Sequence, residues 1–153
     1  AATPDKNTNQ NSTKENNNAT KLGTITHKIF ELYWDKFDEI DIELILNKFE
    51  IIEENEQMKI KNSIENFKSS DVYKLLKSGV EHRFELEFNY QDKKGFIDLV
   101  YFDESKAGWV IIDFKTGIKS QEKEEKYQTQ LKFYEKVLSD IGMSVVGKEI
   151  LWV

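Results

Sequence analysis

Two segments of the sequence are apolar on both alternating faces of a strand, yet each is interrupted by charge. Residues 95–102, GFIDLVYF, contain Asp98, and residues 109–117, WVIIDFKTG, contain Asp113 and Lys115. Strands that are apolar on both faces lie in the middle of a sheet that other elements cover. An unpaired charge inside such a strand costs on the order of several kcal/mol. The three charges must therefore be paired, hold a metal ion or lie at an end of the sheet.

The spacing of these charges predicts that they lie close together. Asp113 and Lys115 are two residues apart, so their side chains leave the same face of one strand. A hairpin with its loop at residues 103–108 would put Asp98 on the neighbouring strand. Two carboxylates with water oxygens suit Mg²⁺ or Mn²⁺, and a nearby lysine can orient a water or stabilise charge on a phosphate. The simpler alternative is a buried ion pair of Lys115 with Asp113 or Asp98.

The periodicity around these strands predicts an α/β fold. We expect a buried helix from about Gly23–Thr24 to Phe37, then two or three short amphipathic helices in residues 40–78, the last capped by Asp71 and ended by Gly79. Alternation in residues 81–90 predicts a half-buried strand with Phe84, Leu86, Phe88 and Tyr90 on one face. A long helix at residues 121–141 and a strand at residues 148–153 follow. This order predicts a mixed β-sheet flanked by helices, with an N-terminal helical region.

The N-terminal segment differs in composition from the rest. The first 20 residues contain no Val, Ile, Leu, Met or aromatic residue. We expect residues 1–21 to form a disordered tail or an interdomain linker. Residues 22–153 are enough for one hydrophobic core, and we expect one domain there.

Charge and cysteine content limit the functional classes. The net charge of −6 argues against a passive basic surface for nucleic acid, although not against an enzyme whose carboxylates hold cations. Arg83 is the only arginine, so phosphate contacts would come mostly from lysines. The absence of cysteine excludes disulfides and cysteine-held metal clusters and fits a cytoplasmic protein. No apolar run is long enough to span a membrane.

Four sequence blocks together resemble a known family. They are GTITHKIFE at residues 23–31, GFIDLV at 95–100, IIDFKTG at 111–117 and QLKFY at 130–134. In this order they resemble the RecB-type nuclease domains of the PD-(D/E)XK superfamily, over about residues 22–140. The chain most resembles the C-terminal nuclease domain of AddA/RecB-type helicase–nucleases, which process broken double-stranded DNA ends. Related AddB-type and CRISPR-associated domains hold an iron–sulfur cluster with four cysteines, so this chain resembles the branch without a cluster.

The resemblance implies a restriction-endonuclease-like fold and a Mg²⁺- or Mn²⁺-dependent deoxyribonuclease, with exonuclease activity expected. Phosphodiester hydrolysis would use a metal-activated water. The implied metal ligands are the side chains of His27, Asp98 and Asp113 and the backbone carbonyl of Phe114. The implied catalytic residues are Asp98, Asp113, Lys115, Gln130 and Tyr134.

Several of these residues also have simpler interpretations. His27 could be a core residue or a helix partner of Glu31, four positions later. Tyr134 could serve packing alone, and Gln130 could either orient Tyr134 or contact phosphate. His82 lies outside every block, and we interpret it as structural.

Further charged residues could join the site. Glu81, Glu85 and Glu87 share one face of a predicted strand. A solvated strand face is the better interpretation of each glutamate, and among the three we favour Glu81 as an additional ligand. A solvated face is also the better interpretation of the lysines around the long helix, which are interleaved with glutamates: Lys119, Lys123, Lys126 and Lys132.

By the same resemblance, the partners would be DNA, expected to be single-stranded, and a helicase domain of the same polypeptide or complex with a partner subunit. The role would lie in processing double-strand breaks. The main alternative is a non-catalytic nuclease-like module that binds DNA or a partner subunit. The three retained charges of Asp98, Asp113 and Lys115 argue against it, because an unused site is free to lose costly buried charges.

Overall fold

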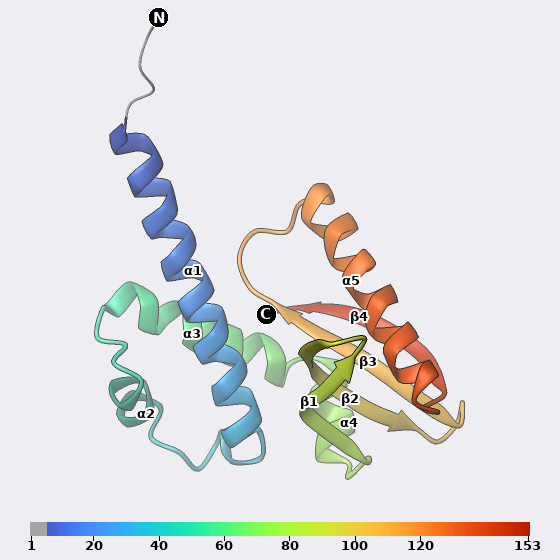
Figure 1. Ribbon diagram of the computed structural model, residues 1–153. Helices are drawn as coiled ribbons and strands as arrows, with labels where there is room; N and C mark the ends of the chain where they lie inside the picture. The colour runs from blue at the N-terminus through green and yellow to red at the C-terminus, as the bar shows by residue number, and fades with distance from the viewer. Residues whose placement is uncertain (1–5) are drawn as a thin grey trace, which may run out of the picture.

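The computed structural model describes residues 6–153, with side chains from residue 19 onward (Figure 1). Its helices are α1 Lys6–Tyr33, the 3₁₀ turn η1 Trp34–Lys36, α2 Ile42–Lys48, α3 Glu54–Lys68, α4 Asp71–Lys77 and α5 Gln121–Asp140. Its strands are β1 His82–Tyr90, β2 Lys93–Asp103, β3 Gly108–Lys115 and β4 Val145–Trp152. The predicted order of helices, three strands, helix and strand is confirmed.

Helix α1 begins earlier than its apolar pattern predicts. It starts at Lys6 rather than near Gly23. Ile29 and Phe30 are fully buried and anchor the C-terminal part. Adding residues to an existing helix is far easier than nucleating one, so a polar segment can extend it. The helical backbone of residues 6–21 differs from the disordered tail expected there; residues 1–5 lie outside the described part, and the linker role remains a prediction.

The predicted short helices before the sheet are present as α2, α3 and α4. The N-cap of α4 is Ser70 and not Asp71, because the Ser70 hydroxyl oxygen accepts the hydrogen bond from the Tyr73 N–H at 3.1 Å. Gly79 follows this helix with φ +95°, the left-handed backbone that glycine adopts without strain. Its N–H donates to the carbonyl of Leu76 at 3.1 Å and so ends the helix as expected.

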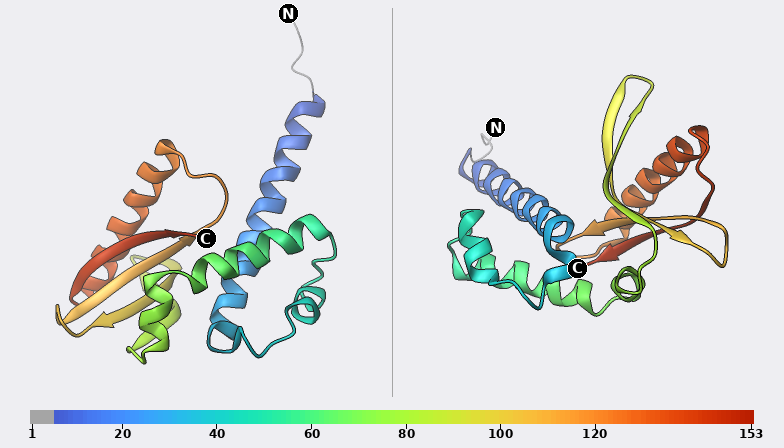
Figure 2. Two further views of the ribbon diagram at one scale, coloured as in Figure 1. Left: turned by 180° about the vertical axis from the view of Figure 1, so that it is seen from behind. Right: turned by 90° about the horizontal axis from the view of Figure 1, so that it is seen from below.

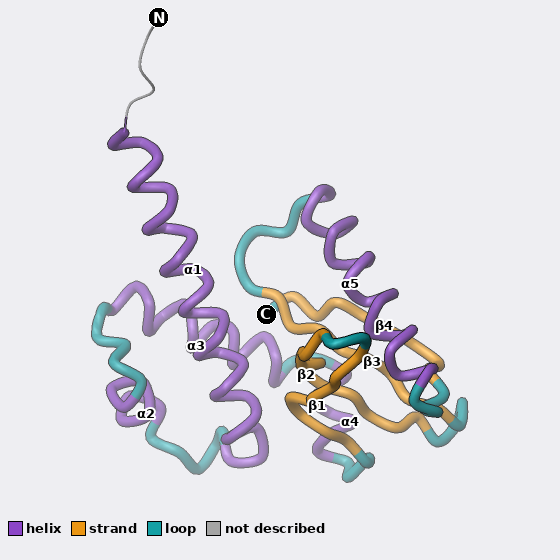
Figure 3. The backbone as a smooth tube through the Cα atoms, in the orientation of Figure 1, coloured by secondary structure: helices purple, strands orange, loops and turns teal. Residues whose placement is uncertain are grey.

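The four strands form one mixed sheet in the order β1-β2-β3-β4. The pairs β1–β2 and β2–β3 are antiparallel, while β4 lies parallel to β3 after the α5 crossover. Helices α1 to α4 cover one face and α5 covers the other, as the views in Figures 2 and 3 show. Two apolar clusters result, one around Phe30, Phe67 and Phe114, the other around Leu131 and Leu138 of α5.

The sheet divides where β2 leaves β3. The two strands pair from Asp103–Gly108 to Leu99–Ile112 and no further. The β1–β2 hairpin continues alone beside α5, as the right-hand view of Figure 2 shows. We call this point, beyond the pair Leu99–Ile112, the fork of the sheet.

The hairpin also changes face at the fork. Glu85 has φ +48°, and the β1–β2 ladder skips it. As a result Phe84 packs with the α1–α4 cluster, whereas Leu86, Phe88 and Tyr90 pack with the α5 cluster. The prediction that these four side chains share one face was therefore wrong. The left-handed backbone at Glu85 interrupts the two-residue alternation on which it rested.

Candidate metal centre

Asp98 and Asp113 are the first residues beyond the fork on β2 and β3. In place of a strand-to-strand bond, the Asp98 carboxylate bridges the gap, and its Oδ2 accepts a hydrogen bond from the Phe114 N–H at 2.8 Å. Asp113 is only 3% exposed. The hairpin predicted from the sequence thus brings the two aspartates together at the position where the sheet opens.

The two carboxyl groups face each other and are crowded. Burial raises the pKa of Asp98 well above its usual range, and the nearby carboxyl of Asp113 raises it further. The Phe114 N–H opposes this shift, and the charge of Glu85 adds to it. Asp113 Oδ2 is buried and accepts no hydrogen bond from any described residue. Lys115 Nζ lies 3.1 Å from this oxygen, so the ion pair of Lys115 with Asp113, the simpler alternative, is present, although the approach lies outside the directions that a hydrogen bond requires.

His27 reaches the fork from α1. Its Nε2 lies 2.9 Å from the Phe114 carbonyl, which can only accept, so Nε2 carries the proton and Nδ1 keeps its lone pair. Nδ1 lies 3.5 Å from Asp98 Oδ1. Burial lowers the pKa of His27; the Phe114 carbonyl and Asp113 oppose this shift, and Lys115 adds to it. A neutral imidazole with Nδ1 turned to a carboxylate is the form that binds a metal. Glu31, the alternative partner, instead pairs with Lys28.

Glu85 is the glutamate of β1 that joins the cluster. Single ligand atoms of His27, Glu85 and Asp98 all lie within 4.8 Å of one another. Burial raises the pKa of Glu85, and the charge of Glu31 raises it further. The preference for Glu81 was wrong, since its side chain is exposed, and Glu87 pairs with Lys94 at 2.9 Å. The left-handed backbone at Glu85 separates it from its neighbours, and no glycine or other sequence signal marks that bend.

Lys115 is held by groups on three sides. Besides its approach to Asp113, its Nζ donates to Gln130 Oε1 at 3.3 Å and lies 4.2 Å from the centre of the Tyr127 ring. The second contact is a cation–π interaction, which is favourable when the ammonium lies over the ring face. In the sequence, Tyr127 is one of several apolar residues of the predicted helix at residues 121–141, and nothing there marks it as a partner of Lys115.

Gln130 and Tyr134 continue this network along α5. Gln130 Nε2 donates to the Tyr134 hydroxyl at 2.8 Å, so Gln130 connects Lys115 to Tyr134. Burial and the charges of Asp113 and Asp98 raise the pKa of Tyr134 to about 12, which keeps the phenol protonated at neutral pH. Tyr134 is therefore more than a packing residue: its ring packs against Phe88, and its hydroxyl lies within the field of the two aspartates.

These groups fit a hard divalent cation. Carboxylate oxygens and a neutral imidazole suit Mg²⁺ or Mn²⁺. The buried, unbonded Asp113 Oδ2 and the raised pKa of Asp98 are what crowded carboxylates show without a cation between them. The donor set is therefore chemically compatible with the metal that the sequence predicts.

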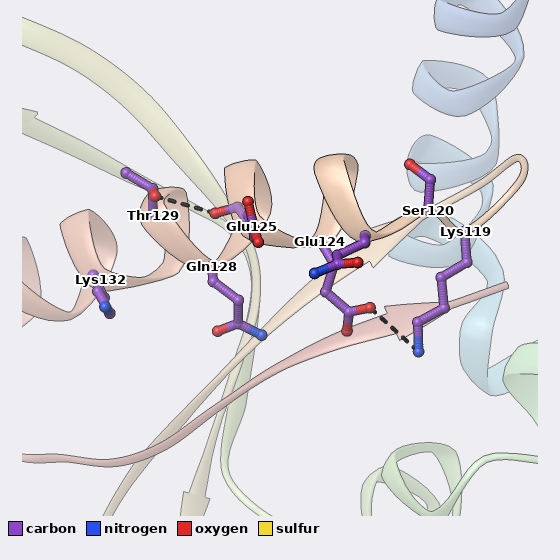
Figure 4. A pocket seen from close by; sticks show the side chains of 8 residues that line it. Lys119, Ser120, Glu124, Glu125, Gln128, Thr129 and Lys132 are labelled. Carbon is purple, nitrogen blue, oxygen red and sulfur yellow. Dashed lines mark hydrogen bonds and ion pairs between the residues drawn. The ribbon is translucent and has the colours of Figure 1, made fainter.

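Other candidate residues lie away from this cluster. His82 bonds the Val80 carbonyl at 3.0 Å and packs edge-on to Trp34, in agreement with a structural role. A hollow on the outer face of α5, drawn in Figure 4, contains Lys119 and Lys132, and Lys119 pairs with Glu124 at 3.5 Å. Its lysines and glutamates are interleaved at the surface, as expected of a solvated face. Among the described residues, no helix has the length and apolar character to cross a membrane.

Comparison with known proteins identifies the family of the chain. None of the curated proteins compared with the chain matches it. The family model of the PD-(D/E)XK nuclease superfamily matches residues 5–152. Asp98 and the Asp113–Lys115 pair carry the residue types of that motif, and the mixed sheet flanked by helices fits a restriction-endonuclease-like fold. By its sequence over nearly its whole length, the chain belongs to the PD-(D/E)XK nuclease superfamily.

Proposed function

We propose that this chain is a Mg²⁺- or Mn²⁺-dependent deoxyribonuclease whose active site is the cluster at the fork of the sheet. The observation that carries the proposal is the crowding of the largely buried Asp98 and Asp113 carboxyl groups beside Glu85, with Lys115 as the ammonium next to Asp113. Lys115 pairs with Asp113 Oδ2, but one ammonium does not balance the adjoining carboxyl groups of Asp98 and Glu85 as well. The negative charge that remains uncompensated at this crowded site supports a divalent cation there.

Asp98, Asp113, Glu85 and His27 Nδ1 are the groups that would hold this cation. The Phe114 carbonyl, which accepts the hydrogen bond from His27 Nε2 on the other side of the ring, would orient the histidine. A bound divalent ion supplies Lewis-acid activation of a water and charge neutralisation at the phosphate. The protein contributes the arrangement of its ligands: the Phe114 N–H orients Asp98, and the Phe114 carbonyl fixes the tautomer of His27. Both interactions come from one peptide segment at the end of β3, so the ligands are positioned together.

Lys115 would supply positive charge to the attacking water or to the phosphate. Gln130 and the ring of Tyr127 hold its ammonium beside Asp113 rather than in solvent. An ammonium fixed in advance stabilises developing negative charge without reorganisation at the moment of reaction. Tyr134, protonated and linked to Gln130, lies where it can donate to a phosphate oxygen.

We further propose single-stranded DNA as the substrate and a helicase, in the same polypeptide or in a complex, as the source of that strand. The resemblance to AddA/RecB-type domains supports this. The net charge of −6 also agrees with it, because a domain with few positive charges gains little from phosphate contacts alone and benefits from delivery of the strand. The role would then be in double-strand-break processing.

The direct test is cleavage of end-labelled single- and double-stranded DNA in Mg²⁺, in Mn²⁺ and in EDTA. We expect cleavage only with metal, and a loss of about 10²-fold or more in Asp113→Asn and in Lys115→Gln. Asp92→Asn and Lys136→Gln are the matched controls. Both residues are exposed, and Asp92 has φ +62°, which asparagine adopts readily. Full activity in Asp113→Asn, or equal activity in EDTA, would refute the assignment.

Manganese titration by calorimetry distinguishes the alternative. We expect Mn²⁺ binding in the intact chain and in Lys115→Gln, and its loss in Asp113→Asn, because Lys115 is not a ligand. Binding of Mn²⁺ and DNA without cleavage under any condition would favour the non-catalytic nuclease-like module.

A further inference from the structure

A cavity of about 610 Å³ adjoins the metal centre between α1 and the β1–β2 hairpin. His27 and Glu85 of the centre form part of its wall. The remaining wall is made by Thr24, Ile25, Lys28, Glu31, Phe49 and Phe96. This volume lies within the range of about 300–1,000 Å³ that small-molecule sites occupy. Whatever fills the cavity therefore touches both the catalytic cluster and two aromatic side chains.

Phe96 presents its ring to this cavity because of the bend in the hairpin. Its neighbour Ile97 is fully buried in the α5 cluster, and successive side chains of a strand point to opposite faces. Phe96 therefore points away from α5, and it remains 46% exposed. It lies two residues before Asp98 on the same strand. Phe96 belongs to neither apolar cluster, and its ring lines the cavity beside the proposed metal ligands.

The charges of the cavity wall do not favour a purely electrostatic ligand. Lys28 is the cation among the lining residues, and it pairs with Glu31 at 3.4 Å. Phosphate contacts alone would be weak here. Stacking of a nucleobase on an aromatic ring does not depend on net charge and tolerates any base sequence.

We propose that this cavity receives the unpaired base next to the scissile phosphate and that the Phe96 ring stacks on that base. This inference rests on the proposed nuclease function and identifies the group that places the phosphate at the metal centre. A base in a duplex is already stacked on both sides and cannot enter the cavity without leaving the helix. Phe96 thereby favours single strands and frayed ends over intact duplex.

The first test measures affinity for a fluorescein-labelled single strand of about 16 nucleotides, by anisotropy, with Ca²⁺ in place of Mg²⁺. We expect Phe96→Leu to weaken binding by about 5- to 150-fold, which corresponds to the ~1–3 kcal/mol of one stacked base. Phe96→Trp should bind the strand about as tightly as the intact chain, because it keeps an aromatic ring at this position. Leu44→Ala is the matched control, since Leu44 is an exposed apolar residue of α2 outside this cavity. Unchanged binding in Phe96→Leu would overturn the proposal.

The second test places a single abasic site at successive positions of the same strand. At one or two positions the missing base should weaken binding to the intact chain and leave binding to Phe96→Leu unchanged. Equal losses in both proteins at every position would overturn stacking by Phe96. Cleavage assays separate this result from the nuclease function. If the intact chain cleaves DNA and Phe96→Leu does not weaken binding, the nuclease function stands and the stacking site is refuted. A chain that needs Phe96 for binding but never cleaves retains the stacking site without the function.

Discussion

The crowding of carboxylates at the fork predicts that Asp98→Asn stabilises the metal-free protein. Asparagine keeps the shape of the side chain. Its amide oxygen can still accept the hydrogen bond from the Phe114 N–H, which measures 2.8 Å in the intact chain. It removes one negative charge from a cluster in which a Glu85 oxygen and an Asp98 oxygen lie within 4.8 Å. Replacing a buried charge that has no adequate counterion often stabilises a protein.

The size of the effect follows from Coulomb's law. Two unit charges 4.8 Å apart repel by about 3.5 kcal/mol at an effective dielectric constant of about 20. The net gain is smaller, because Glu85 is partly solvated and the raised pKa of Asp98 already relieves part of the repulsion by protonation. We expect the free energy of unfolding in EDTA at pH 7.5 to rise by about 1–3 kcal/mol, or roughly 2–4 °C in Tm for each kcal/mol.

The pH dependence has a definite sign. The pKa of Asp98 is higher in the folded state than in the unfolded chain, so its contribution is favourable below the unfolded value near 4 and is lost as pH rises through the folded value. The stability difference between Asp98→Asn and the intact chain should therefore grow as pH rises from about 4 to 8. Urea unfolding at several pH values in EDTA measures this difference.

Metal reverses the order of stability. With Mn²⁺ at about 1,000 times its Kd, the intact chain should gain about 4.1 kcal/mol, which exceeds the advantage of the variant in EDTA, and the variant should gain much less. The reasoning is refuted if Asp98→Asn is less stable than the intact chain in EDTA at pH 7.5. It is also refuted if Mn²⁺ raises the free energy of unfolding equally in both proteins.

Three further predictions concern other parts of the structure. Tyr127→Leu should lower kcat by about 2- to 30-fold through loss of the cation–π contact with Lys115, while Tyr127→Phe keeps it; equal losses in steady-state kinetics would contradict this role. Phe30→Ala should lower the free energy of unfolding by about 3–5 kcal/mol, since Phe30 is fully buried against other rings, and denaturant unfolding measures it. The hydrogen bond from Lys68 lowers the pKa of Asp38, so the contribution of Asp38 is present above about pH 4 and lost as pH falls; a stability profile in acid that is unchanged in Asp38→Asn would contradict it.

The sequence predicted the centre of the fold because its signals were strong and local. Apolar strands interrupted by Asp98, Asp113 and Lys115 implied a covered sheet with a polar site, and the short loop between the strands fixed the antiparallel pairing. His27 entered only through the family resemblance, since nothing in an isolated helix indicates which distant carbonyl its ring will meet.

The features that the sequence did not reveal depend on tertiary context. Glu85 adopts a left-handed backbone that costs on the order of 1–3 kcal/mol, and only the surrounding structure can hold it there. Alternation rules assume a regular strand and therefore put Glu81, Glu85 and Glu87 on one face, and they give no reason to prefer Glu85. The N-terminal extension of α1 was missed for a related reason: its residues carry no apolar pattern, and it continues a helix whose nucleation is already provided by the buried C-terminal part.

The fork joins parts of the chain that are far apart in sequence. The metal centre draws on α1, both strands of the hairpin, the end of β3 and, through Lys115, on α5. Such long-range contacts close large loops and form late in folding. An incompletely synthesised or partly folded chain therefore has isolated carboxylates but no assembled centre. The proposed hydrolytic activity thus requires that the last of these elements has docked.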